Sequence, residues 1–249
     1  MNNLMTQKGL VARFEAAFNR IHVKLKELTT GTSDHISYSE ALYKSRVRHN
    51  VVRHHYELLK QFGHLRNALV HQRFDKDHYI AVPHEDTVKE IERVKTLLMK
   101  PPLALSIASQ PVVCFNPDTP IREILHEVER SGFSQFPIYD ETNFVGLLTE
   151  GGIAKWMSKN IVSDFISLEN VVAKDILVCE KKHNVHFISR ESTIYDLEDV
   201  FEEAFDNNDK LEAVIITQAG KRTQKPIGIV TSWDLVQIDQ TILSIVSQV

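Results

Sequence analysis

Apolar residues in the first hundred positions recur at intervals of three and four. From position 10 onward, the regularly spaced apolar residues are Leu10, Phe14, Phe18, Ile21, Leu25 and Leu28. This spacing places them on one face of an amphipathic helix. The helix should end at residues 29–33, because that run of hydroxyl residues and glycine favours a turn.

A second helix is expected to begin near Ser37 or Ser39, where Ser37-Tyr-Ser-Glu40 resembles a capping box. Its apolar positions continue along a single helical pattern as Leu42, Val51, Leu58, Leu59 and Phe62. We expect Gly63 to break this long helix before a further helical stretch at residues 65–72.

The last part of this region contains a predicted loop and one more helix. The loop falls within residues 74–83, and the helix covers residues 84–100 with apolar positions on one side. Pro101 and Pro102 should end the helix, since proline cannot continue it and restricts the residue before it. The sequence therefore predicts a small helical bundle over residues 1–100.

The rest of the chain contains an internal repeat of strand, helix, strand, strand and helix. The first strands are expected at 112–115 and 185–189, the helix starts at Thr119-Pro120-Ile121 and Ser192-Thr193-Ile194, and the next strands at 136–139 and 213–216. Each copy then ends in Gly-apolar-apolar-Thr, at 146–149 and 228–231. Repeated units bury their apolar faces against each other. We expect an α+β multidomain protein, with an all-α helical bundle followed by an α/β pair: copy 1 at 103–170 and copy 2 at 171–249.

Charge divides the chain at the same point. Residues 1–100 contain 17 Lys and Arg against 11 Asp and Glu, whereas residues 101–249 contain 12 against 22. This asymmetry indicates two domains with different partners, although drift in surface composition would also produce it. Two cysteines exclude a disulfide scaffold and a four-cysteine zinc site. The chain has no apolar run of about 18 residues and no secretory signal, so we expect no membrane partner and a cytoplasmic location.

The repeated half resembles a tandem pair of CBS domains, the arrangement called a Bateman module. The resemblance rests on the repeated Gly-apolar-apolar-Thr ending and on Gly132-Phe-Ser-Gln-Phe-Pro137-Ile. It implies a regulatory adenine nucleotide in the cleft between the copies: AMP, ADP, ATP or a cyclic dinucleotide. It also implies a set of residues that form the wall of that cleft, with Ile229 facing the base: Ala108, Val113, Phe133, Ser134 and Ile229.

Thr231 and Asp234 are the candidate residues that would hold the nucleotide in this cleft. A hydroxyl at a strand end beside a helix N-terminus suits a phosphate or ribose oxygen. A carboxylate three residues later can accept hydrogen bonds from ribose hydroxyls. Copy 1 keeps Thr149 but has Gly152 in place of the aspartate, so its cleft is in doubt. The alternative is that Thr231 and Asp234 only cap a helix.

A candidate catalytic group lies in the helical half. Arg66, Asn67 and His71 match the Arg-polar-x-x-x-His signature and resemble the HEPN superfamily of helical bundles, many of which are metal-independent dimeric ribonucleases. Histidine can move protons near neutral pH, and a guanidinium can stabilise charge on a phosphorane-like transition state. The alternatives are ordinary exposed polar positions, or a HEPN-like fold used only for dimerisation or partner binding.

The geometry of one helix does not bring all three residues together. Asn67 and His71 share a face, but Arg66 and His71 are about 140° apart around an ideal helix. They converge if Arg66 reaches round, if the helix breaks near Gly63, or if a second subunit completes the site. The last option predicts a homodimer.

A basic, histidine-rich run precedes these residues and could follow an RNA backbone. It comprises Lys44, Arg46, Arg48, His49, Arg53, His54 and His55. Tyr43 and Tyr56 look isolated, so no base-stacking platform is expected, and a solvated face is the alternative. No histidine spacing matches a metal site, and no phosphate-binding glycine loop occurs. We therefore expect a nucleotide-sensing regulatory protein with a helical effector, and alternatively a non-catalytic binding module.

Overall fold

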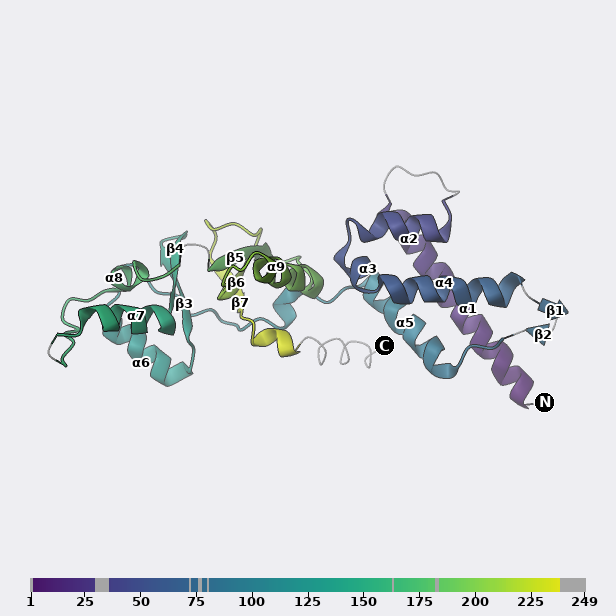
Figure 1. The fold of residues 1–249 in the computed structure, drawn as a ribbon, viewed down its shortest axis with the longest axis horizontal. Coiled ribbons are helices and arrows are strands. Elements are labelled where there is room, and N and C mark those ends of the chain that lie inside the picture. Colours follow the sequence, from purple (N-terminus) through teal and green to yellow (C-terminus); the bar gives the residue numbers. More distant parts are fainter. Residues whose placement is uncertain are drawn as a thin grey trace. The chain divides into compact units, whose positions relative to one another are not determined.

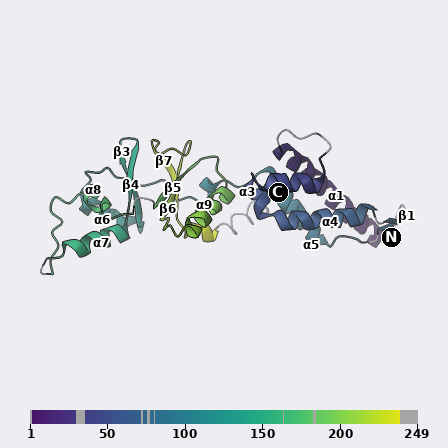
Figure 2. The same ribbon diagram turned by 45° about the horizontal axis from the view of Figure 1, so that its top comes forward.

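A computed structural model describes residues 2–29, 36–71, 73–75, 78–79, 81–162, 164–181 and 184–237. These residues form two compact units, and the division falls between Pro102 and Leu103. The first is a helical unit and the second is an α/β unit, as the two ribbon views show (Figures 1 and 2). The predicted fold class, a helical bundle followed by an α/β pair, is confirmed.

The helical unit contains five helices and a small two-stranded antiparallel sheet within its described residues. Its elements are α1 (Asn2–Leu28), α2 (Tyr38–Arg46), α3 (Asn50–His54), α4 (Tyr56–His71), β1 (Arg73–Asp75), β2 (His78–Tyr79) and α5 (Glu85–Met99). The sheet lies where the sequence predicts a loop. The predicted helices at both ends of the unit are confirmed as α1 and α5.

The apolar stripe of α1 forms the centre of the helical core. Phe14, Phe18, Ile21 and Leu25 are at most 3% exposed. They pack with the buried side of α5, which consists of Val88, Ile91, Val94 and Leu98. Each such side chain contributes about 1.5–3 kcal/mol when fully buried, so this face accounts for the pairing of α1 with α5.

The predicted long second helix is wrong, because the chain forms three helices there. Ser45 donates its hydroxyl hydrogen to the carbonyl oxygens of Ala41 (2.7 Å) and Leu25 (3.1 Å), which ties the end of α2 to α1. The His49 ring lies 3.2 Å from the carbonyl oxygen of Leu28. These contacts hold residues 45–49 against the last turn of α1. A continuous straight helix would carry the chain away from α1, so the helix is interrupted here.

Gly63 does not break a helix, which corrects the second part of that prediction. It lies inside α4, where a Cβ atom would come within 2.9 Å of Cε1 of Tyr38. Tyr38 donates its hydroxyl hydrogen to the carbonyl oxygen of Leu59 at 2.8 Å. Glycine is therefore needed here for the close approach of α2 and not for a turn.

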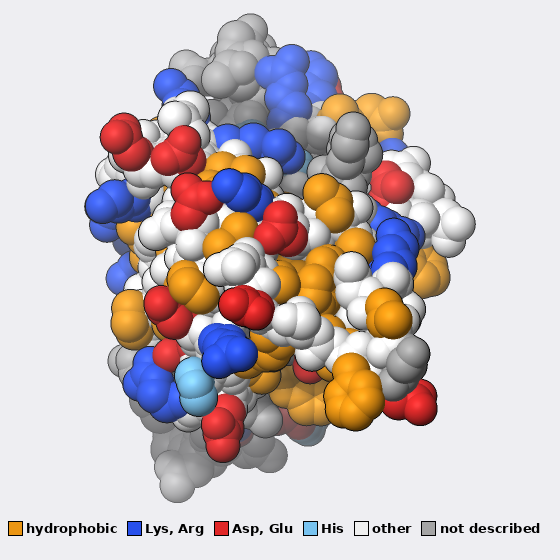
Figure 3. Space-filling view, turned by 90° about the vertical axis from the view of Figure 1, so that its left-hand side faces the viewer, with side chains coloured by type: hydrophobic (Ala, Val, Ile, Leu, Met, Phe, Trp, Pro, Cys, Tyr) orange, Lys and Arg blue, Asp and Glu red, His pale blue; other side chains and the backbone are white. Residues whose placement is uncertain are grey.

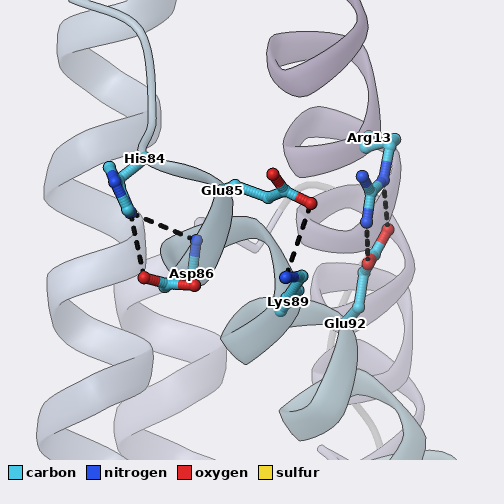
Figure 4. A network of polar contacts seen from close by, with 6 residues as sticks. All are labelled: Arg13, His84, Glu85, Asp86, Lys89 and Glu92. Carbon is cyan, nitrogen blue, oxygen red and sulfur yellow. Dashed lines mark hydrogen bonds and ion pairs between the residues drawn. The ribbon is translucent and has the colours of Figure 1, made fainter.

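A polar network joins α1 and α5 at the surface of the helical unit (Figure 4). Arg13 donates from Nε and Nη2 to the two carboxylate oxygens of Glu92, at 3.0 and 2.6 Å. This bidentate pair lowers the pKa of the Glu92 carboxyl, mainly through the hydrogen bond from Arg13. At the start of α5, the His84 ring accepts a hydrogen bond from the backbone N–H of Asp86. The network fixes how α5 lies along α1.

The α/β unit has most of the repeated order that the sequence predicts, and its copy 2 continues after the last strand with a 3₁₀ helix within the described residues. Its elements are η1 (Ala104–Ser106), α6 (Ile121–Ser131), β3 (Gln135–Asp140), β4 (Asn143–Thr149), α7 (Glu150–Asn160), α8 (Ala173–Leu177), β5 (Val185–Ser189), α9 (Ile194–Asp206), β6 (Ala213–Thr217), β7 (Pro226–Val230) and η2 (Asp234–Gln237). β3 pairs with β4 antiparallel; β5 pairs with β6 parallel, and β6 with β7 antiparallel. In copy 1 the expected first strand is reduced to one parallel bridge, between Phe115 and Ile138.

Each copy is contacted by a segment that the sequence assigned to the other copy. Residues 104–109, at the start of copy 1, bond to copy 2, and α8, at the start of copy 2, packs on copy 1. Ala104 donates its backbone N–H to Ser192, and Ser109 exchanges backbone hydrogen bonds with Ile229 of β7. Conversely, α8 packs on β4 and α7, and Ile176 belongs to the core of copy 1. The chain therefore ties the two copies together at both ends of copy 1.

The two sheets also contact each other directly. Leu147 of β4 shares a buried cluster with Val185 and Ile215 of copy 2. Beside it, the rings of Phe144 and Phe187 lie 5.0 Å apart in an edge-to-face arrangement. Aromatic pairs of this kind add about 0.5–1.5 kcal/mol beyond their buried area. The copies thus share a core, and the grooves beside this core lie between them.

Figure 3 views the end of copy 1, where hydrophobic side chains lie exposed among acidic and basic ones. Between α7 and α8, Ile161, Val162 and Phe165 are 53%, 72% and 79% exposed. Among the described residues, no helix is both long enough and apolar enough to cross a membrane.

Candidate functional site in the cleft between the repeats

A cleft of about 330 Å³ lies between copy 1 and copy 2, and we call it the cleft below. Copy 1 contributes the segment before α6 and the turn after it, and copy 2 contributes β7 and the turn that follows. Its lining residues are Ser109, Pro111, Val112, Val113, Gly132, Phe133, Ser134, Gln135, Glu212, Ile229, Thr231, Ser232, Trp233 and Asp234. The volume lies within the usual range for small-molecule sites.

Thr231 and Asp234 lie together in this cleft. The Asp234 carboxylate oxygen Oδ2 accepts hydrogen bonds from the backbone N–H of Thr231 at 2.7 Å and from its hydroxyl at 2.9 Å. Within the described part of the chain, Oδ1 of Asp234 has no hydrogen-bond partner. One oxygen therefore shapes the turn, and the other can accept from a ligand.

Helix capping alone produces the same local geometry elsewhere. In copy 2, Oδ2 of Asp196 accepts from the backbone N–H of Thr193 at 2.7 Å and from its hydroxyl at 2.8 Å, at the start of α9. Neither residue lines the cleft. The contact between Thr231 and Asp234 therefore has the geometry of a helix cap. It differs from the contact between Thr193 and Asp196 because it lies in a cavity.

The other expected wall residues fall in two groups. Val113, Phe133, Ser134 and Ile229 line the cleft. Ala108 does not: it packs behind β7, where a Cβ atom on Gly228 would lie 2.9 Å from the Cβ of Ala108. Ala108 therefore packs closely against Gly228 of β7, behind the residues that line the cleft.

Several lining residues were missed by the sequence reasoning. Trp233 is 79% exposed in the turn between Thr231 and Asp234, so its position was available from the motif itself. Glu212 precedes β6 and carries no motif, and only the fold brings it to the cleft. Together with Asp234 it gives the lining two carboxylates, and the described lining contains no Lys or Arg. Nζ of Lys210 lies 2.7 Å from Oε1 of Glu212, so the acidic character of the cleft comes mainly from Asp234.

Copy 1 contains the equivalent contact with a different carboxylate. Oε1 of Glu180 accepts from the backbone N–H of Thr149 at 2.7 Å and from its hydroxyl at 2.9 Å. Glu180 follows α8 and lies 31 residues beyond Thr149 along the chain. A Cβ atom on Gly152 would overlap the Glu180 carboxylate, so a side chain there would have to displace Glu180 from its hydrogen bonds to Thr149. Glu180 thus occupies the place of the aspartate that copy 1 lacks.

The candidate catalytic residues of the helical unit are only partly placed. Arg66 and Asn67 line a separate pocket in that unit, described below. His71 is the last residue of α4, and its side chain lies outside the described part of the structure. Because α4 is continuous through Gly63, a helix break does not bring Arg66 and His71 together.

The basic run has an aromatic partner, which corrects the expectation that its tyrosines are isolated. The Arg46 guanidinium lies 4.7 Å from the ring centroid of Tyr43 and 4.5 Å from that of Tyr56. Cation–π contacts of this type hold the guanidinium against the surface. Tyr43 and Tyr56 are therefore used within the protein and are joined through Arg46.

Neither cysteine has the environment of a nucleophile. Burial raises the pKa of the Cys114 thiol to about 11, which keeps it protonated near neutral pH. Cys179 packs against the core of copy 1. Among the described residues, no group of His, Cys, Asp and Glu side chains is placed to hold a metal ion.

Comparison with known proteins assigns the first copy to a family. Residues 104–159 match the family model of the CBS domain. The chain therefore contains a CBS domain. Copy 2 repeats its order of elements, and the two form a CBS pair. No curated protein matches the chain significantly.

Solved CBS structures are similar over somewhat more than half of this chain, at low scores. One is the CBS domain pair of protein MJ0100 in complex with 5′-methylthioadenosine and S-adenosyl-L-methionine, with 20% identity, 57% of this chain and 98% of that chain covered, and a TM-score of 0.43. Another is a CBS domain-containing protein, TM0935, from Thermotoga maritima, with 15% identity, 54% and 92% covered, and a TM-score of 0.39. At such scores, the assignment rests on the family model and on the internal repeat.

Proposed function

We propose that the cleft of the CBS pair binds an adenine nucleotide and that binding regulates the protein. The observation that carries the proposal is Oδ1 of Asp234, which has no hydrogen-bond partner among the described residues and lies at an open cavity with apolar walls. Apolar side chains suit a purine base, and a carboxylate oxygen suits ribose hydroxyls. Val113, Phe133 and Ile229 are the walls available to the base, and Asp234 is the acceptor for the sugar.

The charge of the cleft affects how tightly it binds nucleotides with different numbers of phosphate groups. Asp234 lines it without an ion pair among the described residues, Glu212 is paired with Lys210 at 2.7 Å, and the described lining includes no Lys or Arg. Each added phosphate brings further negative charge toward these acids. We therefore expect affinity to fall in the order AMP, ADP, ATP, with a difference that shrinks as salt screens the charges.

The exposed Trp233 provides a direct test of nucleotide binding. The chain has two tryptophans, and Trp156 is buried in copy 1, so Trp233 is the fluorophore beside a ligand in the cleft. Titration with AMP should change its emission, and calorimetry should give one site per chain. Asp234→Ala should weaken binding about tenfold or more, the usual cost of a lost charge-assisted hydrogen bond.

A matched control separates binding from capping. Asp196→Ala removes the same pair of hydrogen bonds from Thr193 away from the cleft, so it should lower stability and leave AMP affinity unchanged. Equal affinity losses in Asp234→Ala and Asp196→Ala would show that both act only through folding. Folded Asp234→Ala protein that binds AMP normally would remove the proposed site.

The regulatory role follows if the ligand binds one arrangement of the copies more tightly than another. We propose a homodimer in which the helical unit is the effector, with RNA cleavage through Arg66, Asn67 and His71 as one output and a non-catalytic partner contact as the other. Arg66 and Asn67 already line one pocket, which supports a shared role. RNA cleavage by the wild-type protein that disappears in folded His71→Ala would support the nuclease. If the protein cleaves no RNA either with or without AMP, the result supports the non-catalytic output.

A further inference from the structure

A second pocket of about 350 Å³ lies within the helical unit, between α1, α2 and α4. We call it the basic pocket. Its lining residues are Phe18, Asn19, His22, Ser37, Tyr38, Ser39, Leu42, Tyr56, Lys60, Gly63, His64, Arg66 and Asn67. None of these lining residues is acidic, which contrasts with the two carboxylates of the cleft.

The cationic side chains of the basic pocket are weakly neutralised by the protein itself. The Arg66 guanidinium forms no ion pair within the described residues and lies 5.9 Å from the centroid of the Phe18 ring. Lys60 has a single ion pair among those residues, 3.8 Å long, with a Glu57 side chain that is 75% exposed. Exposed pairs of this length contribute little, so both charges remain available to a ligand.

His22 adds a polar atom that the fold leaves unused. Its Nε2 is buried and has no hydrogen-bond partner among the described residues. The ring packs edge-on against Tyr38, with centroids 5.5 Å apart, and Tyr38 is itself anchored to α4. Burial is the main cause that lowers the pKa of His22, and the nearby Lys26 and Arg66 lower it further, whereas a backbone hydrogen bond with Ile36 raises it. Buried polar atoms are normally satisfied, so this one indicates a missing partner.

The first turn of α2 also opens on the basic pocket, through Ser37, Tyr38 and Ser39. Oγ of Ser37 already accepts from the backbone N–H of Glu40 at 3.2 Å, and the Glu40 carboxylate pairs with Lys44 at 2.8 Å. The backbone N–H groups of Tyr38 and Ser39 still have no partner within the helix, and the helix dipole favours an anion there. The amide groups of Asn19 and Asn67 add neutral hydrogen-bond donors. Donors thus converge from three separate helices.

We propose that the basic pocket binds the phosphate group of a small phosphorylated molecule. A tetrahedral dianion can accept from a guanidinium, an ammonium and a helix N-terminus at once, which a planar carboxylate does less well. The aromatic rings of Phe18, Tyr38 and Tyr56 provide a wall for the rest of the molecule. The pocket volume suits a small molecule. This site is independent of the cleft, and its existence does not depend on ribonuclease activity.

Inorganic phosphate and sulfate are the probes for this site, titrated into the full-length protein at low salt. NMR signals of the His22 ring should shift with either anion, and the His22 pKa should rise when sulfate binds, since sulfate stays a dianion across the histidine range. Arg66→Ala should weaken phosphate binding about tenfold or more, and Arg66→Lys should restore part of it. Lys24→Ala removes a charge from α1 outside the pocket and should change affinity less than twofold.

Three results would overturn the proposal. Phosphate that shifts no His22 signal would show that the pocket does not bind anions. Equal losses in Arg66→Ala and Lys24→Ala would show attraction by net charge alone. Single-stranded RNA that shifts His22 where phosphate and sulfate do not would assign the pocket to RNA. Loss of AMP binding in Asp234→Ala leaves this titration unchanged, so the two sites are tested separately.

Discussion

The two copies of the CBS pair build the same contact from different parts of the chain. In copy 2, Asp234 accepts both hydrogen bonds of Thr231 from three residues away. In copy 1, Glu180 accepts the equivalent pair from Thr149 across 31 residues, at the same 2.7 and 2.9 Å. Thr149 is the last residue of β4 and Thr231 directly follows β7, and after each the chain enters a helical segment.

This comparison shows that the contact has two separable purposes. A buried backbone N–H at the strand end requires an acceptor in either copy. In copy 2 the acceptor also lines an open cavity. In copy 1 the Glu180 side chain fills the space that a first-turn aspartate would need. We expect one nucleotide site per chain for this reason.

The largest effect should come from placing a second carboxylate in copy 1. Gly152→Asp would force its side chain into the Glu180 carboxylate and should cost about 3 kcal/mol of unfolding free energy. Urea unfolding, followed by the buried Trp156 in a Trp233→Phe background, measures this cost in copy 1. The double variant Gly152→Asp with Glu180→Ala should be more stable than Gly152→Asp alone, because the local arrangement of copy 2 is then rebuilt. Additive losses would contradict the equivalence of Glu180 and Asp234.

A smaller loss is expected from Glu180→Ala by itself. It leaves the backbone N–H of Thr149, a residue only 5% exposed, without its acceptor, which costs about 2 kcal/mol. Calorimetric titration should show unchanged AMP affinity, in contrast to Asp234→Ala. A Glu180→Ala variant that loses AMP binding while its cleft stays folded would place the nucleotide in copy 1.

The smallest effect concerns the glycine that precedes each threonine by three residues. A Cβ on Gly228 would come within 2.9 Å of both Ala108 Cβ and Leu105 Cδ1, and the Ala108 atom is fixed to the backbone. A Cβ on Gly146 would lie 3.0 Å from the end of the Leu177 side chain, which can move. Gly228→Ala should therefore cost about 1 kcal/mol, because so small an overlap needs only a slight shift of the neighbouring chain, and Gly146→Ala should cost less, by thermal unfolding. Equal costs would show that the tight packing of residues 103–109 on copy 2 contributes nothing.

Local sequence patterns predicted the elements better than their ends. The stripe of α1 and the proline stop after α5 depend on neighbours within a few residues, and both are confirmed. The division of residues 38–71 into α2, α3 and α4 depends on contacts with α1, such as Ser45 with Leu25, and no local pattern reports them. Gly63 was misread for the same reason, because its role depends on Tyr38.

The candidate site follows the same rule. Thr231 and Asp234 were found because a threonine and an acid three residues apart form a local motif. Glu180, Glu212 and His22 carry no motif, and each gains its role from partners far along the chain. The resemblance to CBS domains placed Ala108 in the wall, but it lies behind β7.

The amino-acid sequence by itself determined the helical half, the doubled α/β half and the acid beside Thr231. Short-range periodicity and hydrogen bonding within one turn fix these features, and both can be read along a single stretch of chain. Only the tertiary structure decided that Glu180 completes copy 1, that the cleft is acidic and that a basic pocket lies between α1, α2 and α4. Those properties arise from side chains that packing brings together from distant parts of the chain, and a local sequence pattern does not predict such contacts.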